Sequence, residues 1–373
     1  MPNNLFFHLS VTVLLSFCSP TLFAMSGIAF FDKEAEINHQ APGKLQASIR
    51  QVRTAEEILI KLQAEHYQHQ TFNDTLSSAL LDNYIDQLDP AKAYFTAQDI
   101  AIFEQYRYEL DDGIRRGNLT PAFSMFNLYQ IKATTYLNRL LTELDDRVAA
   151  LNFAREESIA LDAEDVQWAT DEVMLSERNR QLLKNSVLSL KLADKEHDDI
   201  ISTLKTRYSD QLNRLKQLNN EDVFQLYINA LAELYDPHTN YFSPRNSENF
   251  NINMRLSLEG IGAMLKREGE YVTVERLVTA GPAEKQGELQ PNDKIVSVAQ
   301  GENAAVVDVV GWRLDEVVDL IRGEKGSTVV LGVLSEASAT PNLTKKISIV
   351  RNTVKLEEQS ASKTVLELSL IHI

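Results

Sequence analysis

No glycine occurs between Gly117 and Gly260 of this 373-residue chain. Glycine weakens helices because its backbone loses more freedom on folding than that of any other residue, so a long span without glycine favours helix. After Asp236, glycines and β-branched residues return and apolar residues begin to alternate with polar ones, a pattern typical of strands. The sequence therefore predicts a mostly α-helical N-terminal domain followed by a smaller α+β domain.

The composition excludes several classes of protein. Hydrophobic residues make up 44% of the chain and the formal net charge is −16, with a pI near 5.0. A nucleic-acid-binding protein needs a basic surface that neutralises phosphates, which this acidic chain lacks. The single cysteine, Cys18, excludes a disulfide framework and cysteine-based zinc sites.

The first residues have the pattern of a secretory signal peptide. Leu5 to Phe17 is mostly apolar and contains no acid, lysine or arginine, and it is too short to span a membrane. Ala24 could precede a cleavage site, which predicts a signal peptide over residues 1–24 and export to the periplasm. The alternative is a lipid anchor on Cys18. No later segment is long enough to form a transmembrane helix.

Residues 25–236 are expected to form the helical domain. Residues 54–57, Thr-Ala-Glu-Glu, have the spacing of a capping box and predict a helix beginning just before Ile58. Asp89-Pro90 and Asp236-Pro237 are expected to end helices, because proline disfavours helical backbone in the residue before it. Residues 162–189 and 194–218 are long and charged, as expected for solvated helices.

Residues 237–350 are expected to form the α+β domain. Apolar and polar residues alternate over 252–258, which predicts a strand, and four further strands are expected at 271–275, 294–298, 328–334 and 345–350. Leu314, Val317, Val318 and Ile321 recur at helical spacing. Gly323 is the expected C-terminal cap of that helix. A second, short helix is expected after Gly281-Pro282.

Two glycines flank one apolar residue at Gly260-Ile261-Gly262-Ala263, between two expected strands. Glycine allows successive backbone N–H groups to point to one side, and such a nest binds anions. The carboxylate at the end of a peptide suits it, with the peptide lying as an added strand along residues 263–265. The last peptide side chain would enter a pocket formed by Ile261 and the helix at 314–321. The alternative interpretation is a tight turn alone.

The order of elements over residues 251–350 resembles a PDZ domain in its bacterial, circularly permuted form. Asn292 stands where a glycine is common, and asparagine tolerates a left-handed backbone. The resemblance implies a five-stranded, partly open barrel with two helices, and a groove that binds peptides. The expected peptide-binding residues are Gly260, Ile261, Gly262, Ala263, Leu265, Leu314, Val317, Val318 and Ile321.

Several motifs together resemble the tail-specific proteases, also called carboxy-terminal processing proteases. They are residues 236–241 (Asp-Pro-His-Thr-Asn-Tyr), 243–246, 256–262 and 308–315, with His66-Tyr67 and residues 222–224 in the helical domain. The resemblance implies an exported serine endopeptidase with a lysine general base. Its PDZ domain is implied to recognise apolar protein C-termini, and a regulatory lipoprotein partner is compatible with it. It implies neither a metal nor another cofactor.

The end of the chain limits this expectation. Residues 351–365 are similar to the entry into the family's protease core, but residues 366–373 are not, and we interpret them as a non-native tail. No position matches the catalytic serine or lysine, so the chain by itself is expected to be inactive. Ser360 and Lys363 have a Ser-x-x-Lys spacing, but they lie in a polar segment that would not desolvate the lysine. The alternative function is a secreted PDZ adaptor without catalysis.

Three other side chains are candidates for binding or electrostatic roles. His66 and His69 could share a helix face and bind a metal, but no third ligand is evident, and ordinary helix histidines are the simpler interpretation. Arg255 lies close to the glycine loop, where it would add positive potential or serve as a solvated strand residue.

Overall fold

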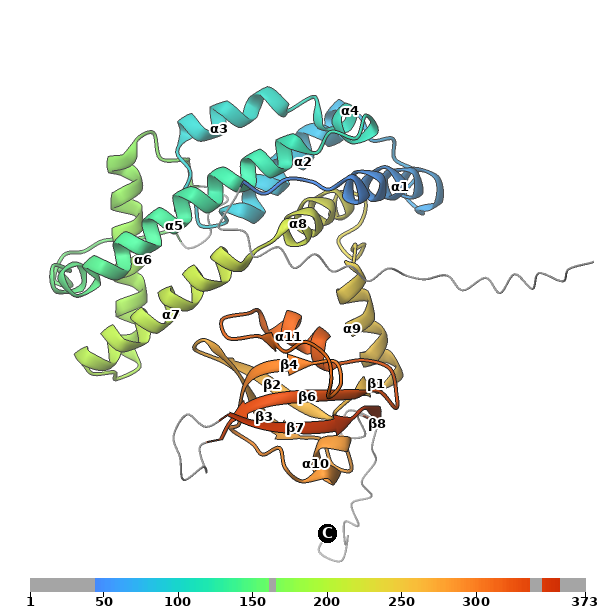
Figure 1. The fold of residues 1–373 in the computed structure, drawn as a ribbon. Helices are drawn as coiled ribbons and strands as arrows, with labels where there is room; N and C mark the ends of the chain where they lie inside the picture. Colours follow the sequence, from blue (N-terminus) through green and yellow to red (C-terminus); the bar gives the residue numbers. More distant parts are fainter. Residues whose placement is uncertain (1–43, 161–165, 336–343, 356–373) are drawn as a thin grey trace, which may run out of the picture. The chain divides into compact units, whose positions relative to one another are not determined.

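The computed structural model describes residues 44–160, 166–335 and 344–355 of the chain (Figure 1). The expected signal peptide and lipidation site at Cys18, the Ser360–Lys363 pair and the tail from 366 all lie outside these residues. Among the described residues, none of the helices is both long enough and apolar enough to cross a membrane.

The structure confirms the predicted helical N-terminal domain. Its helices are α1 (Ile49–Glu65), α2 (Asp74–Leu88), α3 (Ala97–Phe103), α4 (Leu110–Arg115), α5 (Thr120–Ala149), α6 (Glu172–Leu192), α7 (His197–Gln217) and α8 (Asn220–Glu233), with a single 3₁₀ turn at Glu104–Tyr106. They appear in blue to yellow in Figure 1. Helix α2 ends at Leu88, as Asp89-Pro90 predicted.

Helix α1 begins earlier than the sequence suggested. Ser48 is its N-terminal cap: the Ser48 hydroxyl accepts a hydrogen bond from the Gln51 N–H at 3.2 Å, and the Gln51 side chain accepts one from the Ser48 N–H at 2.9 Å. The capping box predicted at Thr54 is therefore wrong, since Thr54 lies inside the helix. The same motif, with glutamine in place of glutamate, occurs six residues upstream.

Large aromatic side chains form the main core of this domain. Tyr84, Phe95, Phe126, Phe224 and Tyr235 are almost fully buried, and burying a side chain of this size is among the strongest contributions to a core. A separate cluster of leucine, isoleucine and valine side chains joins α5, α6 and α7. The periodic apolar residues of these helices therefore serve packing, as their amphipathic pattern predicted.

The prediction of a strand over 252–258 was wrong in its first half. Residues Pro244–Arg255 form helix α9, and the strand begins only at Ser257. Ser243 caps the helix by accepting from the Asn246 N–H, and Pro244 stands in its first turn, the favoured place for proline in a helix. In a strand, Ile252 and Met254 would share one face. In the helix they point in different directions, and Ile252 is buried while Met254 is 69% exposed.

The strands form two antiparallel sheets. The larger has the order β2 (Ala263–Glu268), β3 (Tyr271–Leu277), β4 (Lys294–Ala299), β6 (Thr328–Leu334) and β7 (Thr344–Val350), with β5 (Val307–Asp308) paired to β4. The smaller sheet joins β1 (Ser257–Gly260) to β8 (Asn352–Lys355). The other predicted strands were therefore confirmed, whereas the β1–β8 pair was missed.

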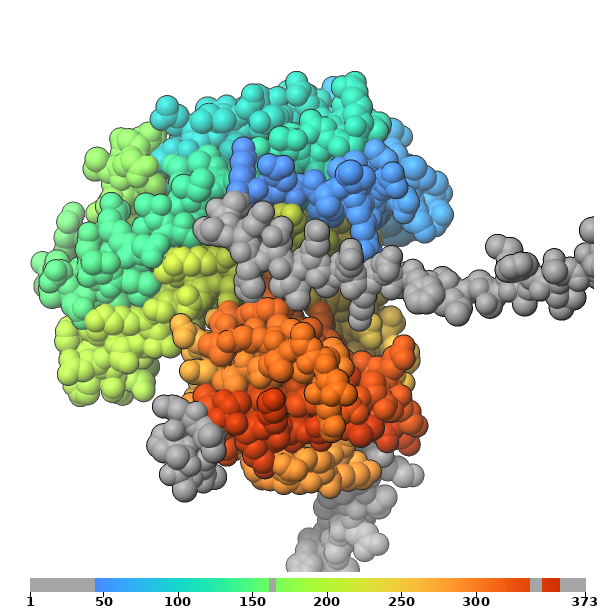
Figure 2. Space-filling view, in the orientation of Figure 1, coloured from blue at the N-terminus to red at the C-terminus, as the bar shows by residue number. Residues whose placement is uncertain are grey.

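Two helices accompany the larger sheet. Helix α11 (Leu314–Ile321) has the predicted bounds and contacts β2 and β4, whereas α10 (Pro282–Gln286) contacts β7; Figure 1 shows them on opposite sides of the sheet. In Figure 2 these elements appear in orange and red as a closely packed body. The predicted α+β domain with two helices on its sheet is thus confirmed, and its described strands form an open sheet.

Asn292 has a φ of +70°, as expected for an asparagine that replaces glycine in a left-handed position. The prediction for Gly323 was wrong. The C-terminal cap of α11 is Arg322, in an extended conformation, and Gly323 is not among the described residues with positive φ. Glycine at 323 therefore needs another explanation.

The cap at Ser48 can be tested by unfolding. Replacing Ser48 with alanine removes the acceptor for an N–H in the first turn of α1, and the expected cost is about 1 kcal/mol in the free energy of unfolding. Thr54→Ala is the control, and its expected change is within about 0.5 kcal/mol, because Thr54 lies mid-helix where alanine is favoured. Denaturant titration followed by circular dichroism measures both; a larger cost at Thr54 would contradict the assignment.

Candidate functional site

Strand β2 lies at one end of the sheet order among the described strands, with β3 as its neighbour. Its other edge therefore presents backbone groups that an added strand could pair with. Helix α11 contacts β2, so the helix, this edge and the loop at residues 260–263 surround the place where the PDZ resemblance predicts a peptide-binding groove. We call it the β2–α11 groove.

Hydrogen bonds fix the direction of the peptide planes in this loop. The Ile261 carbonyl accepts from the Ala283 N–H, and the Gly262 carbonyl accepts from the Val278 N–H, both at 2.8 Å. In a trans peptide the N–H points away from its carbonyl, and the described chain contains no cis peptide bond. The N–H groups of Gly262 and Ala263 therefore both point away from residues 278–283.

Gly262 is the position where this loop requires glycine. Its φ is +73°, and an added Cβ would lie 3.1 Å from the Cα of Gly281 and 3.3 Å from the side chain of Pro282. A residue with a side chain at 262 would thus be strained by the positive φ. Its Cβ would also crowd residues 281 and 282, which belong to the segment that donates hydrogen bonds to the loop carbonyls. Gly260 is less constrained, since a Cβ there would meet the Leu258 side chain at 3.2 Å.

The apolar residues predicted to line the groove divide into two groups. Ile261, Val317 and Ile321 are buried in the core of the domain, where Val317 is fully covered. Leu265 and Leu314 are half-buried and pack against that core, as does Ala263, and Val318 is half-buried. The half-buried side chains are the ones available to an apolar ligand, while Val317 chiefly supports the helix from behind.

Two of the motifs singled out in the sequence meet at the start of α11. Arg313 Nη1 donates to Asp222 Oδ2 at 2.5 Å and to the Gln217 carbonyl at 2.9 Å, and both residues belong to one compact unit of the chain. Arg313 Nε also donates to Asp315 at 3.0 Å. Arg245 of α9 pairs with Asp315 and Asp319. Charged contacts therefore hold the helix that forms one side of the groove.

The other candidates do not gather into a site. His66 follows the end of α1, and its Nε2 lies 3.1 Å from the Thr239 hydroxyl, so His66 and His69 do not share a helix face as was considered. Within the described residues, no cluster of three or more histidine, cysteine or acidic side chains is arranged to hold a metal. Arg255 is an exposed residue at the end of α9 rather than a strand residue.

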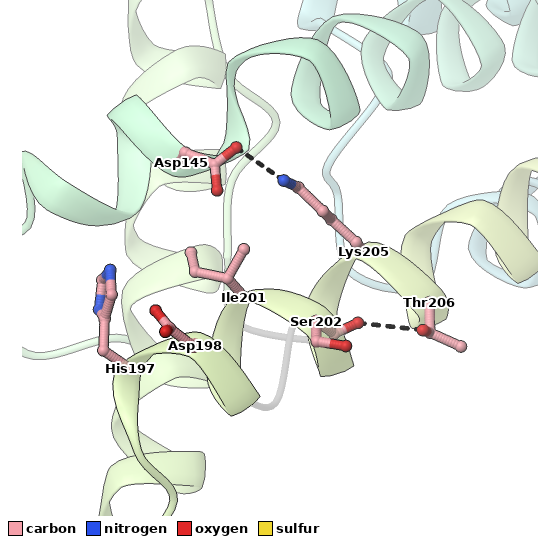
Figure 3. Close-up of a pocket in the computed structure, with 7 residues that line it drawn as sticks. All are labelled: Asp145, His197, Asp198, Ile201, Ser202, Lys205 and Thr206. Carbon is pink, nitrogen blue, oxygen red and sulfur yellow. Dashed lines mark hydrogen bonds and ion pairs between the residues drawn. The ribbon is translucent and has the colours of Figure 1, made fainter.

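A shallow hollow on the helical domain is lined by one residue of α5 and six of α7 (Figure 3). Lys205 Nζ donates to Asp145 Oδ2 at 2.7 Å, and this hydrogen bond holds the pKa of Asp145 below its ordinary value. Thr206 donates to the backbone carbonyl of Ser202. These contacts of Asp145, Lys205 and Thr206 are ordinary for a helix surface, and we assign no function to the hollow.

Comparison with known families identifies both domains. Residues 58–245 match the family described as "Tail specific protease N-terminal domain", and residues 249–334 match the PDZ domain. The chain is 34% identical to the tail-specific protease of Haemophilus influenzae over 313 residues, which cover 83% of this chain and 44% of that protein. It is 31% identical to the carboxy-terminal processing protease CtpA of Bacillus subtilis over 127 residues, 34% of this chain and 25% of the relative.

Among solved structures, the chain is similar to the PDZ domain of the carboxy-terminal protease of Vibrio cholerae, determined in complex with a peptide. The two share 48% sequence identity, with 27% of this chain and all of that chain covered and a TM-score of 0.26. The chain spans less than half the length of the curated relatives named above.

The role of Gly262 can be tested against a second glycine. Gly287 also has a positive φ, +82°, but a Cβ there would meet nothing within 4 Å. Gly287→Ala is expected to cost about 1–2 kcal/mol of stability through backbone strain alone, and Gly262→Ala distinctly more because its Cβ also crowds Gly281. Thermal or denaturant unfolding compares the two variants; equal costs would show that the close packing at 262 is unimportant.

Proposed function

Since the chain belongs to the tail-specific protease family, we propose that its PDZ domain captures the C-terminal tails of protein substrates in the β2–α11 groove. The terminal carboxylate is received by the N–H groups of Gly262 and Ala263. The tail pairs with β2 along residues 263–265. Its last side chain packs on the half-buried Leu314 and Val318, which the buried Ile261 and Ile321 support from behind.

The observation that carries this proposal is the direction of two consecutive peptide planes. Both carbonyls are engaged by residues 278–283, which leaves the two N–H groups directed to the other side of the loop. Hydrogen bonds to a charged acceptor are stronger than neutral ones, about 1.5–3 kcal/mol each. A free carboxylate therefore gains from this loop, whereas an internal stretch of chain would not. The half-buried Leu265 and Leu314 favour an apolar tail.

For the whole protein we propose an exported serine endopeptidase that cleaves the proteins whose tails are captured. The support is the family match together with the greater length of the relatives. In the mechanism that the family resemblance implies, a serine attacks the peptide carbonyl and a lysine accepts its proton. Neither residue belongs to the matched domains, so the described residues supply recognition rather than the chemical step.

Binding of the tail is tested with a pair of peptides that differ only at the carboxylate. A peptide ending in small apolar residues is titrated against the full chain, next to its C-terminally amidated twin. The free carboxylate is expected to bind at least about tenfold more tightly, because the amide loses at least one charge-assisted hydrogen bond. Equal affinities would refute capture through the carboxylate.

We also propose that the two matched domains bind tails without cutting them, which gives a second prediction. The chain as given is expected to leave the same substrate proteins uncut after prolonged incubation, as judged by mass spectrometry. Hydrolysis that disappears in the Ser360→Ala variant would instead assign catalysis to the Ser360–Lys363 pair.

A further inference from the structure

Arg351 is a buried arginine that neither the groove nor the family comparison explains. It stands between β7 and β8, and only 3% of it is exposed. Its side chain donates four hydrogen bonds, with Nε and Nη2 reaching the carbonyls of Ile321 and Leu320 at 2.8 and 3.0 Å. Nη1 reaches the Ser327 hydroxyl at 2.9 Å and Nη2 the Gln300 amide oxygen at 2.6 Å.

The two carbonyls belong to the last turn of α11. Carbonyls at the end of a helix have no partner within it and need an outside donor. Arg351 supplies that donor, and it supplies positive charge where the helix dipole is negative. All four of these acceptors are neutral, and burial lowers the pKa of the guanidinium from its ordinary value, although arginine stays protonated in proteins. The contribution of Arg351 is therefore chiefly geometric, because its planar N–H donors match acceptors in fixed positions.

Gly323 makes room for this arrangement. An added Cβ at 323 would lie 3.0 Å from both Cζ and Nε of Arg351, closer than nearly all real contacts of that kind. This explains why glycine stands just after α11 without a left-handed backbone. Because Gly323 has no side chain, the guanidinium of Arg351 can lie directly against the backbone at 323 and reach the end of α11.

Arg351 is also connected to the loop at residues 260–263, which is proposed to receive the carboxylate. Residues 322–327, the loop that follows α11, are tied to Arg351 by backbone hydrogen bonds from Gly326 to Arg351 and from Arg351 to Ser327, both 2.8 Å. The same loop lies against the approach to Gly260: the Lys325 N–H donates to the Glu259 carboxylate at 3.1 Å. After Arg351 the chain continues into β8, which pairs with β1 up to Gly260. Arg351 therefore joins one side of the groove to the strand that delivers its loop.

We propose that Arg351 is a positioning residue for the carboxylate end of the β2–α11 groove. It fixes the last turn of α11, which carries Ile321, relative to the loop at 260–263. The pocket for the last side chain and the N–H groups for the carboxylate are then held at one spacing. This inference rests on the proposed capture of tails, and it adds a residue that does not touch the peptide.

The test uses the full chain, the carboxylate peptide and its amidated twin, and three variants. Arg351→Met removes the donors, and Arg351→Lys keeps the charge but lacks the planar fork. Lys346→Met is the matched control, because it removes one positive charge from an exposed position on β7. Both Arg351 variants are expected to lose about five- to tenfold in the ratio of carboxylate to amide affinity, while Lys346→Met keeps the wild-type ratio.

The other outcomes would overturn either the proposed function or the positioning role of Arg351. Equal affinities of the two peptides for the wild type would refute the proposed function itself. A wild-type ratio in Arg351→Lys would show that charge alone suffices and would overturn the positioning role, as would a parallel loss for both peptides, which indicates general destabilisation. If the Arg351 variants fail to fold, Gly323→Ala displaces the guanidinium without removing it. A reduced ratio is expected there too, and an unchanged ratio would overturn the proposal.

Discussion

At Gly262 the backbone takes a φ of +73° with the carbonyls on both sides of its α-carbon held by residues 278–283, and the groove depends on this turn. The turn places two N–H groups on one side of the loop and then delivers the chain into β2, whose outer edge bounds the groove. A residue with a side chain would collide with Gly281 and leave this conformation. One backbone position thus joins the proposed carboxylate-binding loop to an edge strand.

Arginine side chains contact both ends of α11, the helix that lies next to this turn and β2. Arg313 and Arg245 engage acidic side chains at the start and along the helix, and Arg351 holds its last turn. An arginine that donates to several acceptors in its fixed planar geometry restricts how those acceptors lie relative to one another. Under the proposed function such restriction is useful, because the distance between the loop at residues 260–263 and the pocket for the last side chain would define where a bound tail ends.

Local patterns predicted much of the fold. The glycine-free span predicted the helical domain, and the spacing of Leu314, Val317 and Ile321 gave the bounds of α11, because burial of one face follows directly from helical periodicity. The failures came where local patterns were ambiguous. Ile252 and Met254 fit an alternating strand as well as a helix, and only the cap at Ser243-Pro244 favoured the helix. Arg351 and the β1–β8 pair depend on contacts distant in sequence, which no local pattern contains.

The NMR signals of the Gly262 and Ala263 backbone amides test the proposed capture of the carboxylate most directly. The full chain is labelled with ¹⁵N, and the carboxylate peptide is added. The Gly262 and Ala263 amide protons are expected to move downfield as they donate to the carboxylate, and the amidated peptide is expected to leave them nearly unchanged. Binding of the carboxylate peptide with both signals unmoved would show that this loop does not receive the carboxylate.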